Sequence, residues 1–267
     1  MSPAAIHSLW PALLDTMSAR FCHLTERLPL GRCLKNGEIT RCWSGWASDT
    51  FNTVLGVPSA VEEVAAITGL YRYYRWPASW WLPEQAPDDV RHWLMQHGWQ
   101  YAESDTAMVR EMSDLPVMPV RCGFRVHEVT TTADMQLFGS IISTIFEHDA
   151  PVEAREVREV YSAMRPPAPE QTYWQLLVGF EQDLPVATAS LFIRDGIASI
   201  NDIATHPAYR RQGIGTAMFG AVLQRIYDSG AAWCVLQASA EGEALYSRYG
   251  FNVMGAFDIW ELHEIAK

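Results

Sequence analysis

Hydrophobic and polar positions follow two different periods along the second half of the chain. Three runs of apolar and β-branched residues have the length and composition of strands: 173–180, 186–193 and 197–205. Asp195-Gly196 separates the last two runs, and this dipeptide is typical of a tight hairpin turn. Another strand-like run, at 124–129, precedes them. The pattern predicts a meander of strands.

Helical periodicity flanks this meander. Apolar residues recur at helical spacing over 132–146, after a polar start that suits a helix cap, and again over 153–164 before two prolines. Further along, the pattern predicts a helix to about Ser229, a strand at 233–237, a short helix at 241–249 and a final pair of strands. Strands that first form a meander and then alternate with helices predict an α/β fold with a sheet of mixed direction.

The stretch at 113–119 contains two prolines and lies between two strand-like runs. A chain of 267 residues also favours about two domains, at ~150 residues each. We therefore predict an N-terminal α/β domain at 1–117 and a second domain at 118–267. The N-terminal part is rich in aromatic residues, including Trp76, Trp80 and Trp81.

Residues 90–112 resemble the end of the chain. Both regions contain an amphipathic helical run, a glycine followed by an aromatic residue, and a strand-like run, with Gly98-Trp99 matching Gly250-Phe251. Two interpretations are open. The first half is a degenerate copy of the second, or any amphipathic helix followed by glycine and a strand gives this appearance.

Composition excludes several classes of function. The formal net charge is −11 and there is no basic run, whereas a nucleic-acid-binding protein needs a basic surface. The first residues show neither a charged start followed by a long apolar run nor a membrane-spanning stretch. We therefore expect a cytoplasmic protein that acts on neither nucleic acid nor membranes, as a monomer or a homodimer.

The five cysteines are odd in number and scattered, and they form no Cys-x-x-Cys pair. This spacing argues against a disulfide framework and against a structural zinc site, and it suits a reducing cytosol. The cysteines are Cys22, Cys33, Cys42, Cys122 and Cys234.

The stretch at 203–216, Ile-Ala-Thr-His-Pro-Ala-Tyr-Arg-Arg-Gln-Gly-Ile-Gly-Thr, is the most informative for function. A strand-like run ends in it and a helical run begins at its end. The first N–H groups of a helix lack intrahelical partners and carry partial positive charge, so they bind anions readily. Gly213 and Gly215 let a phosphate approach the backbone closely, and Arg210 and Arg211 add charge. The stretch therefore predicts a pyrophosphate-binding loop.

The spacing of the glycines distinguishes among phosphate-binding loops. The chain has no Gly-Lys-Ser/Thr triplet of a nucleotide P-loop, and Met218 stands where a dinucleotide fingerprint needs its third glycine. The pattern that fits is Arg/Gln-x-x-Gly-x-Gly/Ala, through Arg210, Gly213 and Gly215.

A second motif at 245–251, Leu-Tyr-Ser-Arg-Tyr-Gly-Phe, follows about 30 residues downstream. The loop, a strand and a short helix with this ending resemble the GNAT superfamily of acyl-CoA-dependent N-acyltransferases, over about residues 122–267. The resemblance implies the GNAT fold, with a mixed, mostly antiparallel sheet flanked by helices. It also implies acetyl-CoA as co-substrate and a reaction without a metal. If the first half of the chain is a degenerate copy of the second, that half is then GNAT-like as well.

The resemblance assigns roles by position. Backbone groups of the strand bind the pantetheine arm and thioester, the loop binds the pyrophosphate, and Tyr246 protonates the departing thiolate. Ser239 stands where many relatives have asparagine. The residues expected to bind acetyl-CoA are Ile203, Ala204, Thr205, Arg210, Arg211, Gln212, Gly213, Ile214, Gly215, Thr216 and Ser239.

The general base is not identified by the resemblance, because relatives with a glutamate carry it where this chain has Ser199 and Cys234. Asp202 lies on the predicted strand, but side-chain alternation can turn it away and leave Asn201 facing the site. The run 147–149 (Glu-His-Asp) ends a predicted helix and is either a substrate-binding group or a solvated loop. We expect His206 to cap a turn and Cys234 to be a buried strand residue.

These observations predict an acetyl-CoA-dependent N-acetyltransferase that transfers acetyl directly to a primary amine, on a small molecule rather than a protein. The amine must lose a proton before it attacks, since a protonated amine has no lone pair. Two alternatives remain open: a catalytically silent acyl-CoA-binding or interaction module, and an enzyme that uses a longer acyl donor.

Overall fold

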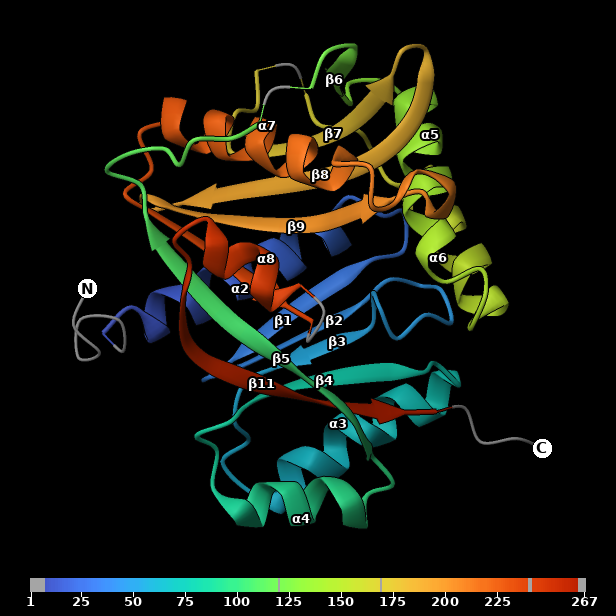
Figure 1. Ribbon diagram of the computed structural model, residues 1–267. Helices are drawn as coiled ribbons and strands as arrows, with labels where there is room; N and C mark the ends of the chain where they lie inside the picture. Colours follow the sequence, from blue (N-terminus) through green and yellow to red (C-terminus); the bar gives the residue numbers. More distant parts are fainter. Residues whose placement is uncertain (1–7, 120, 169, 240–241, 264–267) are drawn as a thin grey trace. The chain divides into compact units, whose positions relative to one another are not determined.

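The computed structural model describes residues 8–119, 121–168, 170–239 and 242–263 (Figure 1). The chain forms two compact units. Unit 1 contains residues 1–108, 237–246 and 253–267, and unit 2 contains residues 109–236 and 247–252. The described residues of the segments 237–246 and 253–267 thus pack with the described N-terminal residues. Compactness does not test which segments fold independently, so domains at 1–117 and 118–267 stay a prediction.

Unit 1 contains a sheet with the strand order β1-β2-β3-β4-β11-β5. Strands β1 to β3 are antiparallel neighbours, β3 and β4 are parallel, and β4 and β11 are antiparallel. The strands are β1 (Arg32–Asn36), β2 (Ile39–Trp43), β3 (Thr53–Leu55), β4 (Ala78–Pro83), β5 (Gln100–Glu111) and β11 (Asn252–Leu262). The helices are α2 (Trp10–Glu26), α3 (Val61–Tyr74), α4 (Asp88–Gln96) and α8 (Glu243–Arg248). Strand β5 and helix α8 begin in unit 1 and end in unit 2.

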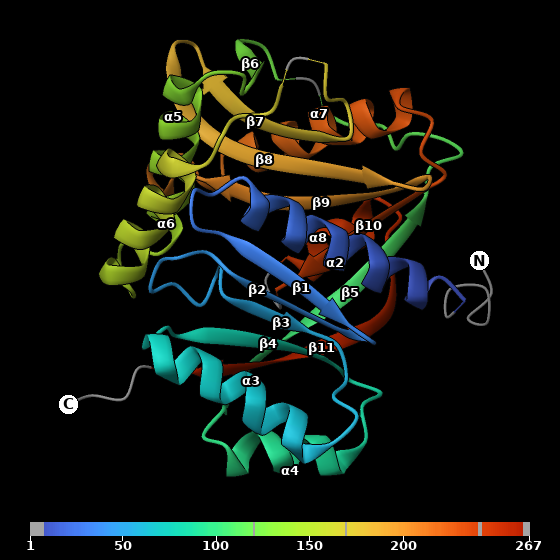
Figure 2. The same ribbon diagram turned by 180° about the vertical axis from the view of Figure 1, so that it is seen from behind.

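The tryptophans of the N-terminal half form much of the core of unit 1. The rings of Trp80 and Trp99 meet edge to face with centroids 5.3 Å apart, and both side chains are buried. Trp80 Nε1 donates to the Gly56 carbonyl, and Trp99 Nε1 donates to Thr68 Oγ1. These large side chains can therefore be buried without leaving their N–H groups unpaired. Figure 2 shows α2 lying along β1 and β2.

Unit 2 contains a sheet with the order β10-β9-β8-β7-β6. Strands β6 to β9 are antiparallel neighbours, and β9 and β10 are parallel. The strands are β6 (Phe124–Glu128), β7 (Trp174–Glu181), β8 (Leu184–Arg194), β9 (Ile197–Thr205) and β10 (Trp233–Ala238). The helices are α5 (Thr132–Ile142), α6 (Pro151–Ala163) and α7 (Ile214–Asp228). Both units thus combine a mixed, mostly antiparallel sheet with flanking helices, which confirms the predicted fold class.

The predicted local signals in unit 2 are confirmed. Asp195 and Gly196 both have positive φ, at 49° and 76°, as a two-residue hairpin turn between β8 and β9 requires. Helix α5 begins at a capping box in which Thr131 and Asp134 each accept from the other's backbone N–H. Buried residues recur along α7 at helical spacing and face the sheet.

The C-terminal end of the chain differs in part from the prediction. The final pair of strands is wrong, because β11 runs unbroken from Asn252 to Leu262, with Gly255 inside the strand instead of at a turn. The short helix predicted at 241–249 is present as α8 (Glu243–Arg248), and its predicted first residue, Glu241, lies outside the described residues.

The chain runs through the same series of elements twice. An antiparallel meander leads through a helix to a parallel strand, then through a second helix to a last strand, as β1-β2-β3-α3-β4-α4-β5 and as β7-β8-β9-α7-β10-α8-β11. Gly98 and Gly250 follow the second helix with φ of 87° and 83°, and buried Trp99 and Phe251 come next. This agreement favours a degenerate copy over a chance likeness.

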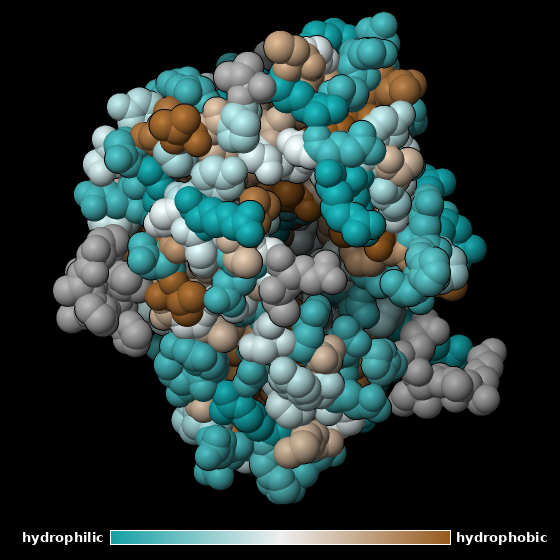
Figure 3. All heavy atoms as spheres, in the orientation of Figure 1, coloured by the Kyte–Doolittle hydropathy of each residue, from teal (hydrophilic) through white to brown (hydrophobic). Residues whose placement is uncertain are grey.

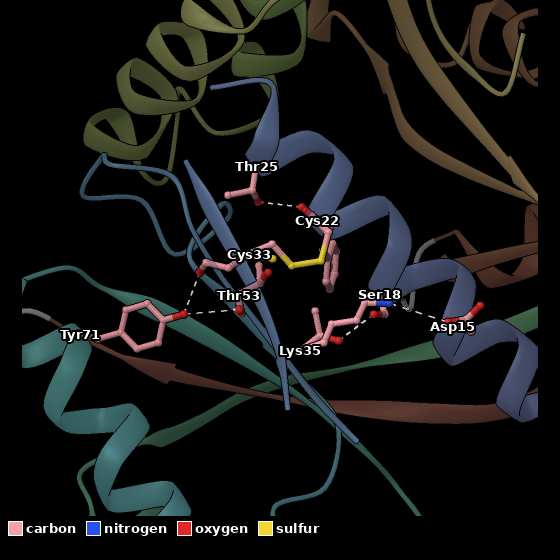
Figure 4. The surroundings of a disulfide bond; sticks show 11 residues. Asp15, Ser18, Cys22, Thr25, Cys33, Lys35, Thr53 and Tyr71 are labelled. Atoms are coloured by element: carbon pink, nitrogen blue, oxygen red, sulfur yellow. Dashed lines mark hydrogen bonds and ion pairs between the residues drawn. A yellow bond between two sulfur atoms is a disulfide. The ribbon is translucent and has the colours of Figure 1, made fainter. Parts of the chain in front are cut away.

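The expectation about cysteines is wrong for one pair. Cys22 on α2 and Cys33 on β1 form a disulfide with their Cα atoms 5.1 Å apart (Figure 4), whereas Cys42, Cys122 and Cys234 are free. The spacing in sequence hides this pair, because it is the packing of α2 on β1 that brings the two residues together.

Hydrophilic residues predominate on the face drawn in Figure 3, and hydrophobic residues stand there in small groups. Across the described residues, every helix is too short or too polar to cross a membrane.

Candidate acyl-CoA site

The predicted phosphate loop joins β9 to α7 within unit 2. Gly213 precedes the first residue of α7 in the left-handed conformation, with φ 82° and ψ 0°, and its carbonyl accepts from the N–H of Ala217 at 3.0 Å. Among the described atoms, a Cβ on Gly213 would meet only Arg121 Nη1, at 3.9 Å. A Cβ on Gly215 would lie 3.2 Å from Thr205 Oγ1. Among the described atoms the space beside Gly213 is therefore open, whereas a side chain at Gly215 would crowd Thr205.

The surroundings of this helix start are positively charged. Arg210, Arg211 and Gln212 are exposed, while Ile214 is buried and anchors the first turn of α7 in the core. Arg210 Nε donates to the Thr205 carbonyl at 3.2 Å, which ties the loop to the end of β9. The first turn itself reads Ile-Gly-Thr-Ala and is uncharged. The N–H groups that α7 leaves without intrahelical acceptors thus follow two exposed arginines in the chain, an arrangement that suits an anion site.

Arg121 contacts this loop from another segment, and the sequence did not predict it. Its Nη1 donates to the Gln212 carbonyl at 2.6 Å, and its guanidinium forms a two-pronged ion pair with Glu181, both bonds being 2.8 Å long. The bonds from Arg121 hold the pKa of the Glu181 carboxyl below its ordinary value. Arg121 therefore fixes the loop from a distant segment. It carries no sequence signal, because an arginine in an irregular stretch looks like any surface cation.

Strand β9 is distorted just before the segment predicted to bind the acyl arm. Its register with β8 shifts between Thr188 and Ser190, and Asp202 has a φ of 56°. Strand β10 pairs with β9 at residues 197–200, so Ile203, Ala204 and Thr205 lie beyond the end of that ladder. A bulge of this kind redirects the strand and its backbone groups.

The bulge also decides the orientation of Asp202. Its carboxylate accepts a short hydrogen bond from Ser190 Oγ, and its carbonyl accepts from Thr188 Oγ1 at 2.9 Å. Asn201 Nδ2 donates to Ser199 Oγ at 3.1 Å. Asp202 is thus engaged by two side chains of β8, which gives it a structural role in holding the bulge.

The remaining base candidates of unit 2 have structural roles. His206 Nδ1 accepts from the Ala208 N–H at 3.3 Å and caps a short 3₁₀ turn, as predicted. Cys234 is buried on β10, as predicted, and burial raises the pKa of its thiol. Residues 147–149 are exposed, with an ion pair from Arg158 to Glu147 at 2.9 Å, which favours the solvated loop.

Ser239 and Tyr246 belong to unit 1, where α8 begins. The Ser239 carbonyl accepts from the N–H groups of Gly242 and Glu243 and so starts the helix. Tyr246 is half-buried, and its ring lies over Gly242, where a Cβ would be 3.0 Å from Tyr246 Cε2. Burial raises the pKa of the Tyr246 phenol, and the charge of Asp105 raises it further. The phenol therefore keeps its proton at neutral pH, as a proton donor must.

Asp105 is the second residue that sequence reasoning missed. Burial, and then the charge of Glu103, raises the pKa of Asp105 to about 6. Its neighbour Thr106 donates to Glu243 Oε2 at 3.0 Å, which ties β5 to α8. A carboxyl with a raised pKa beside a tyrosine is the kind of pair that acid–base chemistry uses. Alternation along β5 was the available signal, since Glu103 and Asp105 lie on one face of that strand.

Two further carboxyl groups of unit 1 are perturbed in the same direction. Burial is the main cause that raises the pKa values of Asp49 and Glu261, and Glu103 adds to the shift at Glu261. We call Asp49, Glu103, Asp105 and Glu261 the acidic cluster. Its combined field favours a bound cation and disfavours further negative charge.

The predicted site residues thus fall into two groups. The loop and strand residues, from Ile203 to Thr216, lie together in unit 2, and Ser239 and Tyr246 lie on the segment that belongs to unit 1. The first group can hold an anion at the start of a helix. The second pairs a phenol with a carboxyl of raised pKa.

Comparison with known proteins agrees with this geometry. A family model described as an acetyltransferase (GNAT) domain matches residues 172–253, which span β7 to the start of β11. No curated protein matches the sequence.

Solved structures share the fold over nearly the whole chain. A GCN5-related N-acetyltransferase from Kribbella flavida has a TM-score of 0.68 at 20% identity, covering 93% of this chain and 94% of its own. A tandem GNAT protein from the clavulanic acid biosynthesis pathway has a TM-score of 0.55 at 11% identity, covering 100% and 98%. A GCN5-related N-acetyltransferase from Sphaerobacter thermophilus has a TM-score of 0.56 at 14% identity, covering 88% and 76%. At these identities the likeness establishes the fold.

The matched domain contains the glycine loop, β10 and the short helix α8 with the motif at 245–251, which are the elements on which the expected resemblance rested. Residues 172–253 therefore form a domain that matches the GNAT acetyltransferase family model.

Proposed function

We propose that this protein is an acetyl-CoA-dependent N-acetyltransferase that acetylates the primary amine of a small molecule. The observation that carries the proposal is the start of α7, which lies within the matched GNAT domain. Gly213 leaves the space over it open, and Arg210 and Arg211 flank it. A helix start of this kind fits a pyrophosphate, because it supplies N–H donors and positive charge without a side chain in the way.

Acetyl-CoA supplies the activated acetyl group as a thioester. In this proposal the backbone N–H groups from Gly213 to Thr216 bind its pyrophosphate, with the two arginines beside them. Backbone groups of Ile203, Ala204 and Thr205 bind the pantetheine arm, because they lie beyond the ladder between β9 and β10. The same strand N–H groups stabilise negative charge on the carbonyl oxygen as the amine attacks.

We assign the proton transfers to Asp105 and Tyr246. Asp105, with a pKa raised to about 6, is largely ionised at neutral pH and is basic enough to accept a proton from the attacking ammonium group. Tyr246 is protonated at that pH and gives its proton to the sulfur that leaves. The amine nitrogen forms its bond to the acyl carbon as the carbon–sulfur bond breaks, so no covalent enzyme intermediate is needed.

The acidic cluster supports a cationic acceptor. An amine approaches in its protonated form at neutral pH, and four carboxyl groups in one region of unit 1 stabilise that charge until Asp105 removes a proton. The net charge of −11 attracts cations over a longer range. We therefore expect acceptors with a second positive charge, such as diamines, to be preferred over monoamines that carry no second charge.

A thermal melt with acetyl-CoA, with ATP and NAD as controls, tests the co-substrate. A ligand at about 100 times its Kd adds about 2.7 kcal/mol to the free energy of unfolding, a readily measured shift. We expect acetyl-CoA and CoA to raise Tm and NAD to leave it unchanged. Equal shifts with all nucleotides would show a general phosphate site and would overturn the assignment.

Release of the CoA thiol in the presence of a panel of amines tests catalysis. Amine-dependent release supports the transferase, and the product mass identifies the acetylated position. Acetyl-CoA binding without release by any amine would support the silent acyl-CoA-binding module. Comparison of acetyl with longer acyl donors in the same assay tests the chain length.

A further inference from the structure

Three of the five cysteines meet in unit 1, and none of them is among the residues assigned to acetyl transfer. The sulfur atoms of Cys22, Cys33 and Cys42 all lie within 4.8 Å of one another. Among the described residues, this is the one group of three or more histidine, cysteine or acidic side chains whose ligand atoms converge in a way that could hold a metal ion.

The fold explains why these cysteines converge. Cys33 on β1 and Cys42 on β2 are directly opposite each other in the antiparallel register, and Cys22 on α2 packs against the same strands (Figure 4). Directly opposed residues of antiparallel strands have their Cβ atoms ~5 Å apart, which brings the sulfur atoms together. Cys42 is fully buried, and the other two are half-buried. The three positions are therefore set by regular secondary structure instead of by a mobile loop.

The surroundings of Cys42 contain polar and charged groups. Burial raises the pKa of the Cys42 thiol to about 12, although the side chains of Thr25 and Thr53 bond to its sulfur, so a bound metal has to displace this proton. Tyr71 donates to the Cys42 carbonyl at 2.7 Å, which fixes the backbone of β2 at this point. Hydrogen bonds from neighbouring groups to ligand sulfur and its backbone are typical of the outer shell of a metal site.

We propose that Cys22, Cys33 and Cys42, in the reduced protein, bind one Zn²⁺ ion through three thiolates. Zinc binds cysteine sulfur at about 2.3 Å, which places the sulfur atoms of one ion about 3.8 to 4.0 Å apart. In the structure the sulfur atoms of Cys22 and Cys33 are joined in the disulfide and must move apart on reduction to reach this spacing, whereas the Cys42 sulfur already lies within 4.8 Å of both. Three thiolates leave a coordination position of zinc open to water.

The disulfide and the ion exclude each other, because both use the sulfur atoms of Cys22 and Cys33. A dithiol reductant supplies the two electrons that break the sulfur–sulfur bond and is itself oxidised to a disulfide. Binding of zinc then displaces the thiol protons into solution. The oxidised chain keeps one thiol of the three, Cys42, and is expected to bind zinc far more weakly.

Metal titration of the full chain tests the site. The protein is reduced with a dithiol, freed of the reductant without air, and titrated with Zn²⁺ alone under native mass spectrometry. We expect one zinc per reduced chain, protection of three thiols from alkylation, and a higher Tm. Co²⁺ in place of zinc should give the charge-transfer absorption of metal–thiolate bonds. Absence of that band, or equal zinc binding by the oxidised chain, would overturn the proposal.

Substitutions separate this site from other thiols. Cys42→Ser and Cys22→Ser should each weaken zinc binding at least about 100-fold, since loss even of an outer-shell partner costs 10- to 100-fold. Cys122→Ser, at an exposed free cysteine, and Cys234→Ser, at a buried one, are the matched controls and should leave it unchanged. If Cys42→Ser binds zinc like the wild type, the site is wrong. Circular dichroism checks that each variant folds. Cys22 is half-buried, so Cys22→Ser should disturb the fold less than Cys42→Ser and still remove one ligand. None of these readouts depends on acetyl transfer.

Discussion

Both halves of the chain contain a strand, a helix and a parallel strand in succession, but the two helices begin with different charges. In unit 1, β3 leads into α3 and then to the parallel strand β4, and in unit 2, β9 leads into α7 and then to the parallel strand β10. Helix α3 begins with Glu62 and Glu63 in its first turn, and Glu63 Oε2 accepts from the N–H and Oγ of Ser59 at 2.9 and 3.1 Å. Helix α7 begins with an uncharged turn after Gly213.

This difference shows how little of a phosphate site resides in the fold itself. At α3 the chain's own carboxylates take the place of an anion and repel another, whereas at α7 the same helix start is left open to a ligand. The later helices differ too, because buried Leu94 on α4 stands where α8 has Tyr246. We infer that only unit 2 binds acyl-CoA, although both halves have the same series of elements.

The largest effect should come from closing the open helix start. Gly213→Glu places a side chain and a negative charge where the pyrophosphate is expected, so acetyl-CoA affinity should fall more than 100-fold, as measured by calorimetry. Gly230→Glu is the matched control, because Gly230 also has a positive φ, 75°, with open space around it, at the other end of α7. Equal affinity in the two variants would refute the loop assignment.

The strands that follow the second helices offer the next comparison. Seven residues after the matched glycines, β5 has Asp105 where β11 has the buried Phe257. Asp105→Asn should lower kcat/KM about 100-fold or more, in the range that general bases contribute. It should also remove the rise of kcat/KM with pH near pH 6, where the wild-type carboxyl loses its proton. An unchanged pH profile would assign the base elsewhere.

The same substitution has a predicted effect on stability. Because the folded-state pKa of Asp105 is raised to about 6, the folded protein binds more protons than the unfolded chain between the ordinary pKa and that value. The free energy of unfolding therefore falls as pH rises through this window. Asp105→Asn should raise Tm at pH 8, and the gain over the wild type should disappear by pH 4. A constant gain at both pH values would contradict the burial of a charge at this position.

Tyr246→Phe tests the difference between α8 and α4. We expect kcat to fall at least about 10-fold with acetyl-CoA affinity unchanged, because the leaving thiolate then departs without a proton. Tyr249→Phe on the same segment is the control, since Tyr249 packs its ring on Phe219 with centroids 5.7 Å apart. If stopped-flow rates are unchanged in Tyr246→Phe, the phenol has only a packing role.

Sequence patterns predicted unit 2 well because its signals are local. The Asp195-Gly196 turn, the Thr131 cap and the periodicity of α7 each depend on neighbours within a few residues, and all are present in the structure. The series of elements in the N-terminal half could be suspected from Gly98-Trp99 alone. The glycine loop was predictable because its chemistry is carried by consecutive residues.

The rest depended on contacts between distant segments. Arg121 reaches Gln212 across 91 positions, and no periodicity marks an arginine that bonds a carbonyl. The raised pKa of Asp105 results from burial, which a strand with exposed neighbours does not indicate. Cys22 and Cys33 meet because α2 packs on β1, so spacing in the sequence could not reveal the pair.

A smaller effect should follow from giving α7 the start that α3 has. Thr216 is the third residue of α7, as Glu63 is of α3, so Thr216→Glu transplants a carboxylate to the equivalent place. Acetyl-CoA affinity should fall about 10-fold, while the helix gains up to about 1 kcal/mol from the charge at its start. Thr216→Gln keeps the shape without the charge and should bind within about threefold of the wild type. A loss of affinity equal in both variants would point to shape instead of charge.

The smallest loss of acetyl-CoA affinity should come from disordering the loop, with the charge at the helix start left as it is. Arg121→Gln removes the bonds to the Gln212 carbonyl and Glu181. The loop of the variant then loses conformational entropy when acetyl-CoA binds, whereas the wild-type loop is ordered beforehand. Acetyl-CoA affinity should fall about three- to tenfold. Arg125→Gln is the control. Arg125 pairs with the exposed Asp183, so this substitution removes the same charge from a nearby segment without touching the loop. If both substitutions weaken binding equally, Arg121 acts through its charge alone. If only Arg121→Gln weakens binding, the contact of Arg121 with the Gln212 carbonyl keeps the loop of unit 2 ready for a ligand. The start of α3 in unit 1, where Glu63 takes the place of an anion, has no use for such a contact.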